Sequence, residues 1–172
     1  MRQEEGLWHR LDVVARSISP FFVTLLLVLF SLVPLRIADL SPIVPALALI
    51  GVFFWSVHRP DLMPIWAVFI IGFIQDLLTG SVIGPGIVGL LIAHALVVWQ
   101  HRFFLAASFA VIWCAFMLVA AAALAVTWLL TCIAMTAYVE PAPLFFQYLV
   151  TTAFYPCLAW AFLRGQRLFQ QR

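Results

Sequence analysis

Charged residues are scarce in this chain: aspartate, glutamate, lysine and arginine together make up only 9% of its 172 residues. A soluble domain has about 25% charged and roughly 45–50% apolar residues, whereas 66% of this chain is hydrophobic. One water-soluble core cannot bury such an excess, so most of the chain is expected to lie in lipid. The length fits one integral membrane domain.

Motifs that indicate catalysis are absent as well. No HExxH, GxSxG or phosphate-loop pattern occurs. Cys114, Cys132 and Cys157 all lie in apolar runs without CxxC spacing, so we interpret them as small hydrophobic residues rather than metal ligands. The sequence therefore predicts no enzymatic activity, no metal and no cofactor. The net charge of +2 is small and gives no sign of a nucleic-acid partner.

Apolar runs of membrane length dominate the chain. A transmembrane helix needs about 20 residues, within a range of about 17–25. Charged and proline-rich breaks separate six candidate spans, which predicts an all-α integral membrane protein with six transmembrane helices. These spans run approximately over residues 19–35, 42–57, 62–78, 83–100, 104–137 and 143–163. The domain organisation is then a cytoplasmic tail at 1–18, a transmembrane domain at 19–163 and a cytoplasmic tail at 164–172.

The arginines orient this arrangement. Eight of the nine fall in the two tails or in the turns at residues 58–59 and 101–102, which would all lie on one side of the membrane. The other side holds only Arg36 and the loop with Glu140. The positive-inside rule then places both termini in the cytoplasm. The indoles expected at the cytoplasmic interface are those of Trp55, Trp99 and Trp160.

The last two spans have individual features. The fifth run of about 34 residues would form roughly 50 Å of helix, which exceeds the roughly 30 Å hydrocarbon core. No charge or proline interrupts it, so one long tilted helix is preferred, with two short spans as the alternative. Pro156 lies within the sixth span and should kink that helix.

The end of the third span is the most informative stretch, because an acid and an amide there meet a cluster of glycines. A charge on a bilayer-spanning segment costs about 2.5–3.5 kcal/mol on insertion scales, so Asp76 is expected to have a role. Gly72, Asp76 and Gly80 are spaced by four residues and share one helix face, where a neighbouring backbone can approach closely. The candidate motif for partner binding or structure comprises Gly72, Gln75, Asp76, Gly80, Ser81 and Gly84.

Three interpretations of Asp76 stay open at this point. The carboxylate can extend to the membrane interface, since it lies close to a loop. It can accept hydrogen bonds from free backbone N–H groups of residues 79–86 and the next helix start, which attract an anion. It can also form a proton or substrate site, although a transport role would want a second charge within the membrane, and the sequence has none. The two structural interpretations are favoured.

His94 is the one histidine well inside a span. It lies roughly 15 Å from the outer edge of the fourth span, so a direct pair with Asp76 is not expected. We interpret it as a neutral histidine that is hydrogen-bonded between helices.

The candidate motif also carries a family resemblance. Residues 72–84 keep each position of the pattern G-x-x-x-D-L-x-x-G-S-x-x-G, and they follow a span that ends in the basic turn at residues 58–59. In these features, residues 42–102 resemble the rod shape-determining protein MreD family. The last span, with Tyr155-Pro156 followed by Arg164 and Arg167, is similar to the family's C-terminal helix.

The resemblance implies a bacterial inner-membrane, multi-pass scaffold of the rod elongation complex, without enzymatic activity. The implied partners are an MreC-like bitopic protein, the MreB-like actin filament system, the elongation peptidoglycan synthases and the lipid bilayer. The implied fold is similar to the six-helix substrate-binding component of energy-coupling-factor transporters. A substrate-binding membrane component of a vitamin-type transporter is therefore the alternative function.

Overall fold

The computed structural model describes residues 20–31, 45–80, 82–104, 107–136 and 138–170. Regular structure in these residues is helical throughout, with no strand, so the predicted all-α class is confirmed for the part of the chain described. The α-helices are Pro20–Ser31, α2 (Leu47–His58), α3 (Ile65–Thr79), α4 (Pro85–Trp99), α5 (His101–Phe104), α6 (Phe109–Met135) and α7 (Ala142–Gln170). A short 3-10 helix, η1 (Pro60–Leu62), connects α2 to α3.

Six apolar helices occupy the places of the six candidate spans, but most are shorter than predicted. Among the described residues, two helical segments are long and apolar enough to cross a bilayer, α6 and the Ala142–Phe162 part of α7. Helices of 12–15 residues such as α2 and α3 measure about 18–22 Å, less than the roughly 30 Å hydrocarbon core. Six full membrane crossings therefore stay a prediction.

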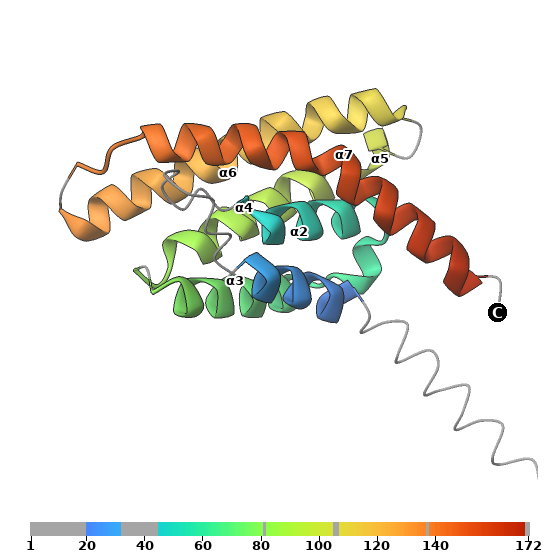
Figure 1. Ribbon diagram of the computed structural model, residues 1–172, viewed down its shortest axis with the longest axis horizontal. Coiled ribbons are helices and arrows are strands. Elements are labelled where there is room, and N and C mark those ends of the chain that lie inside the picture. Colours follow the sequence, from blue (N-terminus) through green and yellow to red (C-terminus); the bar gives the residue numbers. More distant parts are fainter. Residues whose placement is uncertain (1–19, 32–44, 81, 105–106, 137, 171–172) are drawn as a thin grey trace, which may run out of the picture.

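The fifth and sixth runs differ from their predicted boundaries in opposite ways. The fifth run is one uninterrupted helix of 27 residues, α6, which begins at Phe109 rather than near residue 104. Helix α7 continues past the predicted end at residue 163 to Gln170. Pro156 lies inside α7, and the ribbon of this helix changes direction along its length (Figure 1). A proline within a helix is a recognised cause of such a bend.

Helix α2 lies at the centre of the bundle. All but one of its 12 residues are buried, as expected of a helix that is apolar on every side. Phe53 of α2 packs edge-on against Phe116 of α6 and Tyr155 of α7, with ring centroids 5.0 and 5.7 Å apart. Gly51 of α2 faces Thr24 of the helix Pro20–Ser31 so closely that a methyl group at residue 51 would lie 2.8 Å from the threonine methyl.

Consecutive helices run in opposite directions, so their ends gather at two opposite ends of the bundle (Figure 1). One end contains the α3–α4 turn and the α6–α7 connection, and we call it the Asp76 end. The opposite end contains η1 and α5, and we call it the Arg59 end. In the orientation predicted from the arginines, the Asp76 end faces away from the cytoplasm.

The three tryptophans expected at the cytoplasmic interface behave differently. The indoles of Trp99 and Trp160 are exposed at the Arg59 end, and the Arg164 guanidinium lies 4.4 Å over the Trp160 ring. Trp55 is only 7% exposed, so its indole does not face outward as an interfacial indole does. The indole packs inside the protein against Phe54 and Phe162 because α2 is surrounded by other helices.

Candidate functional site at the α3–α4 turn

Asp76 joins the end of α3 to the beginning of α4. Its side chain is only 4% exposed, and its Oδ2 atom accepts hydrogen bonds from the backbone N–H groups of Gly84 at 2.9 Å and Ile87 at 3.4 Å. The first N–H groups of a helix have no partner within that helix, and they attract negative charge. We call these two bonds the Asp76 contact. They match the second interpretation.

Glycines make this contact sterically possible. A methyl group at Gly72 would lie 2.8 Å from the Cα atom of Ile87, so a larger residue would hold the backbones of α3 and α4 apart. A methyl group at Gly86 would collide with Oδ1 of Asp76. The shared face of Gly72 and Asp76 expected from their spacing is therefore used inside the chain, for the packing of α3 on α4.

The turn between the two helices depends on backbone conformations that favour glycine. Gly80 ends α3 with φ of 65°, and Gly84 precedes α4 with φ of 127°. Residues with a Cβ atom rarely adopt these values. Pro85 follows at the first position of α4, where its missing N–H costs no hydrogen bond. The short turn makes α3 and α4 antiparallel neighbours and brings Gly84 to Asp76.

The candidate motif is thus gathered in one place. Gly72, Asp76 and Gly84 meet between α3 and α4, Gly80 forms the turn, and Gln75 lies beside them. Ser81 lies outside the described residues. Pro156 is remote in sequence and belongs to a different part of the fold, α7.

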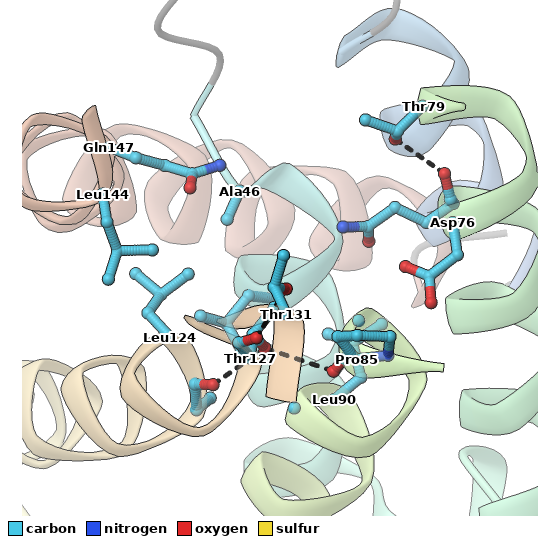
Figure 2. Close-up of a pocket in the computed structure, with 15 residues that line it drawn as sticks. Ala46, Asp76, Thr79, Pro85, Leu90, Leu124, Thr127, Thr131, Leu144 and Gln147 are labelled. Carbon is cyan, nitrogen blue, oxygen red and sulfur yellow. Dashed lines mark hydrogen bonds between the residues drawn. The ribbon is translucent and has the colours of Figure 1, made fainter. Parts of the chain in front are cut away.

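A cavity of about 180 Å³ opens beside the motif, at the Asp76 end of the bundle (Figure 2). Five helix ends contribute to it, those of α2, α3, α4, α6 and α7. The lining residues are Ala46, Leu49, Gln75, Asp76, Thr79, Pro85, Gly86, Gly89, Leu90, Ala123, Leu124, Thr127, Thr131, Leu144 and Gln147.

Two threonines of α6 form the polar wall opposite α3. The Thr127 hydroxyl lies 2.9 Å from the Ala123 carbonyl and 3.3 Å from the Pro85 carbonyl at the start of α4. The Thr131 hydroxyl donates to the carbonyl of Thr127 at 2.8 Å (Figure 2). Gly89 of α4 faces Thr127 without room for a methyl group, which brings α4 close to α6.

Sequence reasoning missed these threonines, together with Gln147 of α7. A signal was present, because Thr127 and Thr131 are four residues apart and share one face of an otherwise apolar helix. Nothing in the sequence pattern, however, places that face opposite Asp76, about 50 residues away along the chain.

His94 has a separate environment further along α4. Its Nδ1 atom lies 2.8 Å from the hydroxyl of Ser56 on α2, and both residues are buried. This bond agrees with the interpretation of His94 as a histidine hydrogen-bonded between helices. Ile87 and His94 are seven residues apart, or about 10 Å along the helix, so His94 stands apart from the Asp76 contact.

The fold and this site define a class, that of an apolar protein whose described residues form a helical bundle with a carboxylate buried between two helices. A family model described as rod shape-determining protein MreD matches residues 13–164. The chain therefore belongs to the MreD family. No curated protein and no solved structure matches the chain.

Family membership has a direct functional consequence. It assigns the chain to the machinery that determines rod shape, in a family of membrane proteins that is not a known enzyme family. The apolar helices of the described residues, two of which are long enough to cross a bilayer, are compatible with that location.

Proposed function

We propose that this protein is a non-enzymatic scaffold of the bacterial rod complex in the inner membrane, crossing it several times with both termini in the cytoplasm. It would organise peptidoglycan synthesis through helix–helix contacts with an MreC-like bitopic protein and the elongation wall synthases, in association with the MreB-like filament system. The observation that carries this proposal is the MreD family match, which extends over residues 13–164.

The Asp76 contact gives this scaffold a physical basis. Partner helices in a membrane associate through close packing and hydrogen bonds, so a binding surface must keep its shape. The bonds from Asp76 to Gly84 and Ile87 fix the start of α4 against the end of α3. We propose that the motif shapes the partner-binding surface through this helix pair, because Gly72 and Asp76 are themselves enclosed by it.

The alternative function, a substrate-binding component of a vitamin-type transporter, gains no support from the comparisons. The matching family is one of shape determination.

Depletion and complementation in a rod-shaped host test the scaffold function. Cells depleted of the native chain are expected to become round, and the wild-type chain should restore rods. The Asp76→Ala variant should fail to do so at equal membrane abundance. Asp61→Ala is the matched control, because Asp61 is an exposed carboxylate at the Arg59 end, and it should restore rods. Depleted cells that keep their rod shape and their pattern of wall insertion would refute the proposal.

A further inference from the structure

The cavity at the Asp76 end is rich in hydrogen-bond acceptors. The Asp76 carboxylate can only accept, and both of its bonds with described residues involve Oδ2. The Oε1 atom of Gln75 is buried and has no hydrogen-bond partner within the described residues. A buried acceptor without a partner calls for an explanation, such as a bound molecule.

The threonine hydroxyls add to this excess. Thr79 and Thr131 donate their hydrogens to the carbonyls of Gln75 and Thr127. Thr127 likewise donates to a main-chain carbonyl. A hydroxyl whose hydrogen is used offers only oxygen lone pairs to its surroundings. All three threonines line the cavity, so they present acceptors to whatever occupies it.

Side-chain donors are few by comparison. Among the described residues that line the cavity none is basic, and the side-chain N–H groups come only from Gln75 and Gln147. The side-chain acceptors of this lining are therefore complemented by an occupant that brings donors and positive charge. Ammonium supplies three donors and guanidinium five, neither has an acceptor, and their bonds to a carboxylate are charge-assisted.

The size of the cavity favours an ammonium or guanidinium group over a bare metal ion. A single water needs about 10–15 Å³ of comparable space, whereas this cavity has about 180 Å³. The described residues also contain no cluster of three or more His, Cys, Asp or Glu side chains that could hold a metal. A polyatomic occupant fits both observations.

We infer that the cavity between Asp76, Gln75 and Thr131 is a binding site for a positively charged nitrogen group, an ammonium or guanidinium, that enters at the Asp76 end. The group can belong to a free organic amine or to a basic side chain of a bound protein. The inference is independent of the proposed scaffold function, because binding is measured on the isolated chain.

The test is calorimetric titration of the full chain, purified in neutral lipid nanodiscs, with agmatine, which carries both a primary ammonium and a guanidinium. Butylurea is the matched uncharged probe. Agmatine should bind saturably and at least tenfold more tightly than butylurea. The absence of saturable agmatine binding would overturn the inference.

Variants locate the site. Gln75→Leu removes the unpartnered acceptor and should weaken agmatine binding about tenfold, which corresponds to about 1.4 kcal/mol. Gln75→Leu leaves no polar group without a hydrogen-bond partner. In the absence of agmatine, the variant should therefore unfold at a denaturant concentration no lower than that of the wild type. Gln100→Leu, the same change at the Arg59 end, should leave the affinity unchanged. Equal affinity of the wild type and Gln75→Leu would place binding elsewhere and overturn the inference, whether or not Asp76→Asn can also be purified.

The same titration of the chain in complex with an MreC-like partner distinguishes the two sources. If agmatine does not bind to the complex but binds again once the partner is removed, the occupant is a basic side chain of the partner. Unchanged binding in the complex identifies a free amine.

Discussion

Removal of the Asp76 carboxylate should destabilise the helix pair α3–α4 by an amount that follows from its two bonds. The bond from Gly84 has an ordinary length, 2.9 Å, and a bond to a charged acceptor contributes about 1.5–3 kcal/mol. The bond from Ile87 is long, 3.4 Å, and we assign it about 0.5 kcal/mol, the low end for any hydrogen bond. Asp76→Ala should therefore lower the free energy of unfolding by about 2–4 kcal/mol.

Asparagine at position 76 shows how much of the stabilisation comes from the charge, because it is nearly the same shape as aspartate but is uncharged. It keeps a side-chain oxygen near both N–H groups, and bonds to ionised groups are roughly twice as strong as neutral ones, so Asp76→Asn should cost about half as much, about 1–2 kcal/mol. The exposed Asp61→Ala control should change stability by less than about 0.5 kcal/mol.

The assay is reversible unfolding of the purified chain in mixed micelles, with helix content followed by circular dichroism. The expected order of stability is wild type and Asp61→Ala first, then Asp76→Asn, then Asp76→Ala. If Asp76→Ala unfolds at the same denaturant concentration as the wild type, the Asp76 contact contributes nothing and this reasoning is refuted.

Three other substitutions test the packing in the same assay. Gly72→Ala should cost about 1–3 kcal/mol, the usual range for overpacking, because its methyl group meets the Ile87 backbone; wild-type stability would show that α3 and α4 are not in close contact. Gly80→Ala should cost about 1–2 kcal/mol, since φ is 65° there, and no loss would contradict the left-handed end of α3. Ser56→Ala leaves Nδ1 of His94 without its partner and should cost about 1–3 kcal/mol, whereas a neutral result would argue against the buried bond.

The sequence predicts the local geometry of the motif well. Gly72 and Asp76 are four residues apart on one helix, and Gly84 follows within one short turn, so helical periodicity and turn chemistry suffice to bring them together. Hydrogen bonds from backbone N–H groups to Asp76 could also be expected, because the start of the next helix is only a few residues away.

Helix ends and burial are predicted less well, and the reason is physical. Hydropathy measures how apolar a segment is, and lipid tails are as apolar as leucine, so it does not distinguish a lipid-facing helix from one enclosed by protein. Helix α2 is enclosed on all sides, and Trp55 is therefore buried although its place in the sequence suggested an interface. The same insensitivity extends the predicted fifth run at both ends, from residue 104 to 137, whereas α6 begins at Phe109 and ends at Met135.

The cavity could not be predicted, because it depends on contacts between residues far apart in the chain. Thr127 and Gln147 face the α3–α4 turn only after α6 and α7 have packed on α4 and α2. A single sequence carries no record of such pairings.

Recovery of an MreC-like partner with the purified chain tests the central claim, that the Asp76 contact maintains the surface which holds that partner. With equal amounts of the chain on the affinity matrix, Asp76→Ala should retain about fivefold less partner than Asp61→Ala, the factor that corresponds to about 1 kcal/mol of lost binding free energy. Equal recovery of the partner with both variants would contradict the account.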